Sequence, residues 1–308
     1  MSASASLAVR AYAKINLDLK ILGLRPDGYH EVRTVLQSLE MHDTLTFTPV
    51  QGPFAIACDQ PGVPTDSRNL VWRAAQLLWS LRSGGGAPLE GVRVTLAKRV
   101  PAEAGMGGGS SDAAAALLAL SSLWGMSLDL PSLARLGARL GADVPFFLGG
   151  GTALGSGKGD DVSPLVEPPP TAVVVVKPPF GVPTPDAYAW YDEDLPTRPV
   201  RAVRRTVPGW PAWAHDLRND LEGPVASRFP QIRRTLRELT ALGAVHAAMT
   251  GSGSAVFGLF GHPDVAAAAQ AALAGRGEAA ILTATLPESV VAEQRQRVLA
   301  GRRIPRID

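Results

Sequence analysis

The sequence predicts an α+β protein, because segments with strand-like alternation come mainly first and helical segments follow without a regular β-α-β order. Two further observations support this fold class. A glycine-rich loop in the first half opens directly into a long alanine-rich helical run. A second loop of glycine and serine separates two short apolar runs near the end of the chain.

The first half is expected to mix strands with helices. Period-two alternation predicts strands over residues 7–11 and 15–21, and a Pro-Asp-Gly turn within residues 24–30 ends the second strand. Apolar residues at helical spacing, followed by Ser-Gly-Gly-Gly, predict a helix over residues 69–82. The remaining expected elements are short strands at 45–47 and 54–56, a strand at 91–97, and helices at 111–124 and 131–141.

A change of composition over residues 155–171 separates the two halves, and we place domains over residues 1–158 and 159–308. The second half is expected to be a compact β-α-β domain capped by helices. Residues 178–211 are rich in proline and lack periodicity, so little regular structure is expected there. The expected strands are 173–176, 245–249, 255–260 and 279–286, and the expected helices are 219–228, 230–242, 263–275 and 287–299.

The composition is that of an ordinary globular protein, with 308 residues, 46% of them hydrophobic and 19% charged. A net charge of +2 supplies no strong field for nucleic acid or a membrane surface. The one cysteine, Cys58, allows no intramolecular disulfide and gives no zinc-ligand spacing. No apolar stretch approaches the roughly 18 residues that span a bilayer, and the first ten residues lack a secretory signal. We expect a cytoplasmic monomer or weak homodimer that binds a small molecule, not nucleic acid or a membrane.

Residues 100–112, V-P-A-E-A-G-M-G-G-G-S-S-D, form the most informative segment of the chain. Glycines at 107–109 let the backbone approach a ligand, and Ser110 and Ser111 stand where a helix is expected to begin. Free N–H groups and the positive end of a helix dipole at one point suit a polyphosphate. The loop lacks the lysine of a Walker A motif and the β-α-β unit of a dinucleotide fingerprint. A flexible linker is the alternative, but its position between a strand-like run and a helix favours a binding loop.

Three other segments contain candidate functional residues. In A-K-I-N-L, Lys14 and Asn16 share one strand face, which is either a solvent face or the lining of a site. In G-A-D-V-P-F-F, Asp143 before Pro145 is typical of a helix cap, but its apolar neighbours place it near the core, where a carboxylate needs a partner such as Lys14. The loop M-T-G-S-G-S-A-V-F, residues 249–257, is either a plain β-turn or a second wall of a phosphate site.

Together these segments resemble the motifs of a known superfamily. A-K-I-N-L, P-A-E-A-G-M-G-G-G-S-S-D and T-G-S-G-S-A-V-F are similar, in this order, to the three motifs of the GHMP kinases. Within the superfamily, R-P-D-G-Y-H, G-A-D-V-P-F-F and P-T-P resemble the kinases that phosphorylate the 2-hydroxyl of a cytidine diphosphate-linked methylerythritol, on a route to isoprenoid precursors. The resemblance implies a two-domain fold, with an N-terminal ribosomal-protein-S5-like β/α domain that binds ATP, a C-terminal ferredoxin-like domain, and the substrate site between them.

The resemblance also implies roles for the matching residues, with ATP as co-substrate and Mg²⁺ as its metal ion. Asp143 would accept the hydroxyl proton, and Lys14 would hold the carboxylate and the hydroxyl in place. Asn16 would approach the erythritol, and Ser110 or Ser111 would bind the magnesium. The residues implied for ATP are Asn69 and Lys98 near the adenine, and Pro101, Ala102, Glu103, Ala104, Gly105, Met106, Gly107, Gly108, Gly109, Ser110 and Ser111 around the phosphates. Those implied as a further wall are Thr250, Gly251, Ser252 and Gly253, and those for the cytidine are Tyr29, His30, Thr184 and Tyr188, with the two tyrosines on opposite faces of the base.

Two other interpretations stay open from the sequence. Another GHMP kinase, of the homoserine or mevalonate type, would share both glycine loops, but its substrate has no base for Tyr29, His30 and Tyr188 to bind. A non-catalytic nucleotide-binding sensor of the same fold would share them as well, but it has no need for the pair of Lys14 and Asp143.

Overall fold

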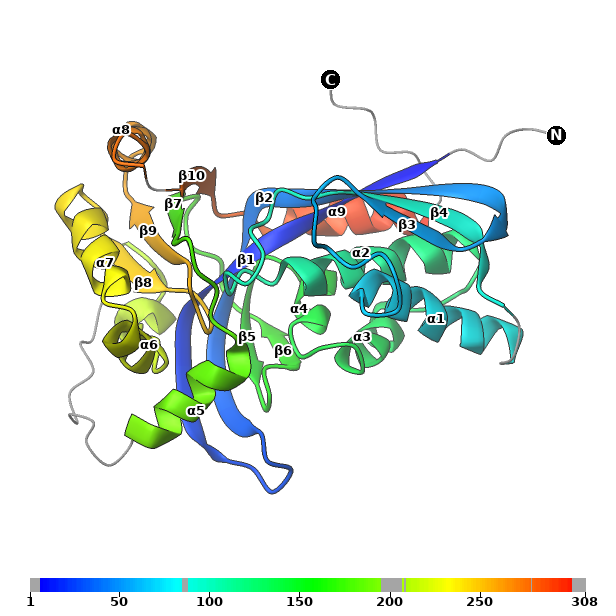
Figure 1. Cartoon of the computed structure of the whole chain (residues 1–308), viewed down its shortest axis with the longest axis horizontal. Helices are drawn as coiled ribbons and strands as arrows, with labels where there is room; N and C mark the ends of the chain where they lie inside the picture. The colour runs from blue at the N-terminus through cyan, green and yellow to red at the C-terminus, as the bar shows by residue number, and fades with distance from the viewer. Residues whose placement is uncertain (1–5, 85–87, 195–206, 208, 278, 301–308) are drawn as a thin grey trace.

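Two β-sheets, each with helices packed against it, make up the protein (Figure 1). The computed structural model describes residues 6–84, 88–194, 207, 209–277 and 279–300. The first sheet has the strand order β3-β4-β2-β5-β6, with β1 paired to β2, and the second has the order β10-β7-β9-β8. Strand pairing is antiparallel except between β3 and β4. The expected α+β class is confirmed. Within the described residues, no helix has the length and apolar character needed to cross a bilayer.

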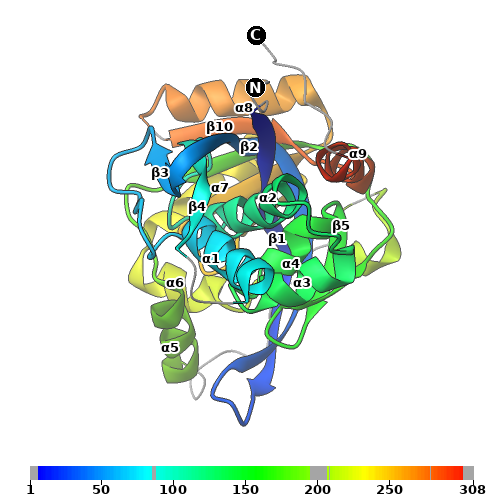
Figure 2. The ribbon, with the colours of Figure 1, turned by 90° about the vertical axis from the view of Figure 1, so that its right-hand side faces the viewer.

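The first sheet is built on one long hairpin. β1 (Leu7–Leu24) and β2 (His30–Pro53) pair along most of their length, and their far end protrudes from the rest of the molecule (Figures 1 and 2). The expected turn joins them, with Gly28 at a φ of +82°. The two strands expected within residues 7–21 are therefore one continuous strand, and residues 45–47 belong to β2. The other strands of this sheet are β3 (Ala55–Cys58), β4 (Glu90–Ala97), β5 (Thr152–Ser156) and β6 (Asp161–Pro164).

Helix α2 (Gly108–Leu123) packs against β1 and β2 and is buried from Ser111 to Ser121, which explains its run of alanine and leucine. It begins three residues earlier than expected. Gly107, with a φ of +71°, occupies the N-cap position and no side chain caps the helix, so the two serines lie inside the first turn. The other helices of this half are α1 (Leu70–Ser83), α3 (Leu130–Ala138) and α4 (Val144–Gly149).

The second sheet contains β7 (Ala172–Lys177), β8 (His246–Met249), β9 (Val256–Phe260) and β10 (Ala279–Ala284). Its helices are α6 (Glu222–Arg228), α7 (Gln231–Ala241) and α8 (Pro263–Ala274), with a 3₁₀ turn at Ala212–His215. The expectation of little structure over 178–211 is wrong for α5 (Thr184–Asp194). This helix buries only Ala187 and Tyr191, too few residues to produce an apolar stripe in the sequence. Residues 195–206 and 208 lie outside the described residues.

The last helix, α9 (Glu288–Leu299), returns to the first half and packs on α2, α4 and β1. Its Gln294 replaces a strand neighbour at the outer edge of β1. The main-chain N–H of Arg10 donates to Oε1 of Gln294 (3.0 Å), and Nε2 of Gln294 donates to the carbonyl oxygen of Arg10 (2.9 Å). One amide thus satisfies both backbone groups of a strand edge that has no partner strand.

We expect Gln294→Ala to lower the free energy of unfolding by about 1–2 kcal/mol, because both backbone groups of Arg10 lose their partner. Gln296, exposed on the same helix, provides the matched control, and Gln296→Ala should change that free energy by less than about 0.5 kcal/mol. Urea denaturation of the two variants measures both values. Equal effects would show that the amide of Gln294 does not stabilise the edge of β1.

Candidate active site

The first glycine loop (residues 101–110), the second glycine loop (residues 250–255) and strand β1 meet at one place. The hydroxyl of Thr250 accepts a hydrogen bond from the N–H of Asn16 (3.0 Å) and lies 3.2 Å from the carbonyl oxygen of Gly105. The N–H of Ala255 donates to the carbonyl oxygen of Ala104 (3.3 Å). The second loop therefore lies against the first, although the two are far apart in the chain.

The backbone amides of the first glycine loop are available to a ligand. Within the described residues, no N–H of residues 105–110 donates a hydrogen bond, and the next amide along the chain, that of Ser111, donates to Gly107 (2.9 Å). Glycine is required at two positions with positive φ. A Cβ on Gly105 would lie 2.1 Å from the carbonyl oxygen of Thr250, and a Cβ on Gly107 would lie 2.6 Å from the ring of Phe147. Free amides at the positive end of α2 form a site suited to an anion.

Lys14 and Asn16 share one face of β1, and that face lines the site. Nζ of Lys14 donates to Oδ1 of Asn16 (2.5 Å) and lies 3.4 Å from Oδ2 of Asp143. The lysine side chain is 4% exposed and the aspartate side chain 35% exposed, so a buried ammonium holds a carboxylate that reaches the open side. Asp143 precedes α4 but makes no side-chain capping bond. Asp143 thus occupies the N-cap position, but its side chain pairs with Lys14, as expected, and does not cap the helix.

The two serines of the first loop face different surroundings. The side chain of Ser111 is buried and lines a small cavity beside β1 and α9. The hydroxyl of Ser110 lies on another side, 3.7 Å from the position that a Cβ on Gly141 would take, near the segment that carries Asp143. Of the two candidate metal ligands, the structure thus places only Ser110 toward the remaining site residues.

The predicted cytidine residues are only partly brought together. The His30 ring stacks on Tyr188 of α5, with ring centroids 4.8 Å apart and an angle of 26°. Tyr29 does not face Tyr188. Its side chain is exposed, and Nζ of Lys158 lies 4.8 Å from its ring centroid. Because successive residues entering a strand point to opposite sides, His30 and not Tyr29 faces the helix.

Two further contacts place α5 within the site. The hydroxyl of Thr184, at the start of α5, lies 3.0 Å from the hydroxyl of Ser252 in the second glycine loop. Burial, with a smaller contribution from the charge of Asp143, raises the pKa of Tyr188 to about 12. The contact between Thr184 and Ser252 joins α5 to the second glycine loop, and the charge of Asp143 acts on Tyr188 of the same helix.

The two residues predicted near the adenine both have partners within the protein. Asn69 caps α1, since Oδ1 accepts from the N–H of Val71 (2.9 Å) while Nδ2 donates to the carbonyl oxygen of Pro64 (2.7 Å). Lys98 is 7% exposed at its side chain, and Nζ donates to Oδ2 of Asp43 (2.5 Å) and Oδ2 of Asp112 (2.6 Å). Its ammonium is therefore buried between two carboxylates.

The cluster of Asp43, Lys98 and Asp112 was not predicted from the sequence. Oδ1 of Asp43 accepts from the N–H groups of Arg99 (2.5 Å) and Val100 (2.8 Å), just before the first glycine loop. Asp112 lies just after the loop, so Lys98 links the two ends of the loop. Burial raises the pKa of Asp112 to about 7, against the opposing effect of Lys98. Asp43 lies in another strand, and no local pattern connects it with the loop.

Comparisons with known proteins agree with this geometry. The family models described as GHMP kinases N terminal domain and GHMP kinases C terminal match residues 69–151 and 204–279. The chain is 44% identical over 254 residues to the 4-diphosphocytidyl-2-C-methyl-D-erythritol kinase of Pelotomaculum thermopropionicum, which covers 81% of this chain and 87% of that protein. It is 41% identical over 292 residues to the protein of the same name from Moorella thermoacetica, covering 92% and 98%.

Solved structures give the same result. A crystal structure of 4-(cytidine 5'-diphospho)-2C-methyl-D-erythritol kinase matches with a TM-score of 0.75 and 37% identity, over 91% of this chain and 99% of that chain. A homoserine kinase from Cytophaga hutchinsonii matches with a TM-score of 0.62 and 17% identity, over 93% and 96%, which shows a shared fold alone.

We expect Lys98→Met to lower the free energy of unfolding by about 3–5 kcal/mol, because two buried carboxylates lose the charge between them. Arg99→Met is the matched control: the Arg99 side chain is 69% exposed and pairs with Asp59 at the surface, so its loss should cost less than about 1 kcal/mol. Chemical denaturation measures stability, and nucleotide titration measures ATP affinity. If Lys98→Met has normal stability but binds ATP more weakly, the result would support the predicted role of Lys98 near the adenine.

Proposed function

The chain belongs to the 4-diphosphocytidyl-2-C-methyl-D-erythritol kinase family of the GHMP kinases, and we propose that it transfers the γ-phosphoryl group of ATP to the 2-hydroxyl of 4-diphosphocytidyl-2-C-methyl-D-erythritol. It is an ATP-dependent small-molecule kinase of isoprenoid precursor synthesis. The observation that best supports this function is the pair of Lys14 and Asp143 beside a loop of free backbone amides.

The first glycine loop would bind the phosphates of ATP. Phosphoryl transfer depends chiefly on positioning and on neutralising charge, and involves little covalent chemistry by the protein. Free amides over residues 105–110 and the positive end of α2 would supply donors for both purposes. The second glycine loop supports this cradle, because Thr250 and Ala255 hold the backbone of the first loop in place.

Asp143 would accept the proton of the 2-hydroxyl as the new oxygen–phosphorus bond forms. Its carboxylate is partly exposed and can reach a substrate, whereas the buried ammonium of Lys14 is held by Asn16 and fixes the carboxylate in position. A general base must stand within hydrogen-bond reach of the proton that it takes, so this positioning is its main requirement. Lys14 also adds a positive charge beside the reacting hydroxyl.

The site offers few protein ligands for a magnesium ion. Within the described residues, no group of three or more His, Cys, Asp or Glu side chains could hold a metal. Magnesium bound with a nucleotide needs only one or two protein oxygens, since phosphates and water supply the rest. The hydroxyl of Ser110 would be such an oxygen, while Ser111 points into its cavity. When bound, the ion would neutralise charge on the phosphate oxygens.

The cytidine end of the substrate would lie between the two halves of the chain, which we divide at residue 158. His30 comes from the hairpin of the first half, whereas Tyr188 and Thr184 come from α5 of the second. A ring face for stacking and a polar ring edge beside it suit a pyrimidine base. Such boundaries between two packed units are common ligand sites.

The proposed function is tested by ATP consumption. We expect rapid turnover with 4-diphosphocytidyl-2-C-methyl-D-erythritol and little with homoserine, with mevalonate, or with the methylerythritol phosphate that lacks the cytidine group. Equal rates with and without the cytidine group would contradict the proposed substrate. ATP binding with no turnover on any of them would favour a sensor.

We expect Asp143→Asn to lower kcat by about 10²- to 10⁴-fold, because the amide cannot accept the hydroxyl proton. ATP affinity should be nearly unchanged, since Asp143 is not part of the amide cradle. Asp264→Asn, at an exposed position on α8, is the matched control and should retain wild-type kcat. Steady-state turnover assays measure kcat, and nucleotide titration measures ATP affinity. A normal kcat in Asp143→Asn would exclude Asp143 as the base.

We expect Tyr188→Ala to raise KM for the cytidine substrate about 5- to 150-fold, which corresponds to the roughly 1–3 kcal/mol of one base stacked on an aromatic ring. Tyr188→Phe retains the ring and should stay near the wild-type KM. Steady-state kinetics with ATP saturating gives both values. A KM that does not change on losing the ring would place the base elsewhere, for example against the exposed Tyr29.

A further inference from the structure

One face of helix α5 surrounds the ring of His30. Nε2 of His30 lies 2.9 Å from Oδ1 of Asp192. Tyr188 stacks on the same ring, and Tyr191 contacts it edge-on, with centroids 6.0 Å apart and an angle of 83°. Residues 188, 191 and 192 are three and four positions apart, so they lie on one side of the helix. The His30 side chain is only 12% exposed within this arrangement.

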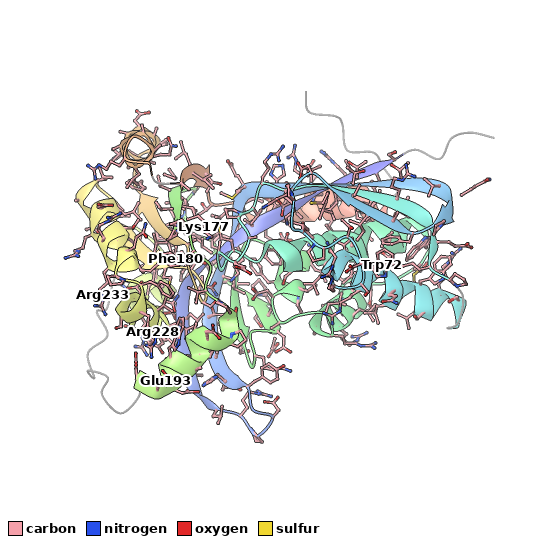
Figure 3. All side chains as sticks on the ribbon, viewed as in Figure 1. Trp72, Lys177, Phe180, Glu193, Arg228 and Arg233 are labelled. Carbon is pink, nitrogen blue, oxygen red and sulfur yellow. The ribbon has the colours of Figure 1, made fainter. Side chains whose placement is uncertain are left out.

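Helix α5 is itself fixed at both ends. At its start, the hydroxyl of Thr184 contacts Ser252 of the second glycine loop (3.0 Å). At its end, the guanidinium of Arg228 on α6 binds Glu193 (2.6 Å) and Asp194 (3.2 Å), and Figure 3 shows Arg228 beside Glu193. Glu193 and Asp194, which follow Asp192, thus pair with Arg228 of α6. Asp192 contacts His30 of the hairpin.

The contact with Asp192 determines which ring nitrogen of His30 bears the proton. An ionised carboxylate can only accept hydrogen bonds, so Nε2 must donate. In a neutral imidazole the other nitrogen, Nδ1, then presents a lone pair and acts as an acceptor. Without the carboxylate, either tautomer is available, and Nδ1 can equally well become a donor.

We propose that Asp192 is a positioning residue that keeps His30 in the form with a hydrogen-bond acceptor at Nδ1, and that this form selects a cytosine over a uracil base. Cytosine offers an amino donor at position 4, whereas a uracil offers an acceptor oxygen there. An acceptor on the protein pairs with the first and repels the second. The proposal rests on the proposed function, in which His30 lies beside the base.

The kinetic test compares the cytidine substrate with its uridine analogue near pH 8, where an ordinary histidine is neutral. We expect the wild-type enzyme to prefer the cytidine compound in kcat/KM. In Asp192→Ala this preference should fall by about tenfold, through KM and not kcat. Glu193→Gln removes an acidic group from the next position, 63% exposed and paired with Arg228, and should keep the wild-type preference.

The second measurement needs no turnover. Nitrogen-15 chemical shifts of the His30 ring, in the protein without substrate, report which nitrogen bears the proton. We expect protonation at Nε2 in the wild type and in Glu193→Gln, and a mixture of tautomers in Asp192→Ala. An unchanged tautomer, or an unchanged preference between the two bases, overturns the proposal. If the wild type phosphorylates no cytidine compound, the proposed function fails, and the ring shifts still test whether Asp192 controls His30.

Discussion

The buried polar face of strand β1 is the constraint on which the rest of the structure depends. Lys14, Asn16, Asp18 and Lys20 are each at most 8% exposed. Charges and amides placed this deeply need partners, because an unpaired buried charge costs several kcal/mol. Most of those partners come from the second half of the chain. Thr250 binds Asn16, the N–H of Arg218 binds Asp18 (3.0 Å), and Asp216 binds Lys20 (3.1 Å). The polar face of β1 that carries Lys14 and Asn16 therefore also holds the two halves together, through Asn16, Asp18 and Lys20.

This arrangement couples the reacting groups to the loops around them. Asn219 adjoins the residues that pair with β1, and its amide donates to the carbonyl oxygens of Met249 and Gly251 (2.8 Å each). Those two carbonyl groups flank Thr250, whose hydroxyl contacts both Asn16 and Gly105. A displacement of the second glycine loop would thus move the face of β1 and the first glycine loop together. One connected hydrogen-bond network joins Asn16 of β1 to both glycine loops.

Much of this could be predicted from the sequence where the signal is local. The apolar spacing and the Ser-Gly-Gly-Gly that follows it located α1, and the need of a near-core carboxylate for a partner pointed from Asp143 to Lys14. Non-local arrangements could not be predicted. The sequence around Lys98 does not indicate that its ammonium pairs with carboxylates in another strand and in α2. Helix α5 has too small a buried face for its periodicity to be visible. Which of two adjacent residues in a turn, Tyr29 or His30, faces that helix depends on the hairpin's orientation.

The charged side chains beside the first glycine loop are already paired, and this bears on the glycine content of the loop. In a Walker A loop a lysine reaches the phosphates directly. Here the lysine before the loop, Lys98, lies between two carboxylates, and Lys14 is paired with Asp143, so each ammonium group already has a carboxylate partner within the protein. The donors left for a polyphosphate are backbone amides and the positive end of α2. Backbone donors act only if a ligand can approach them closely, and a side chain at Gly105 or Gly107 would also collide with the packing behind the loop. Because both lysines are paired with carboxylates, a polyphosphate bound here would depend on backbone donors. Such donors require a loop of glycines, which leaves the backbone accessible.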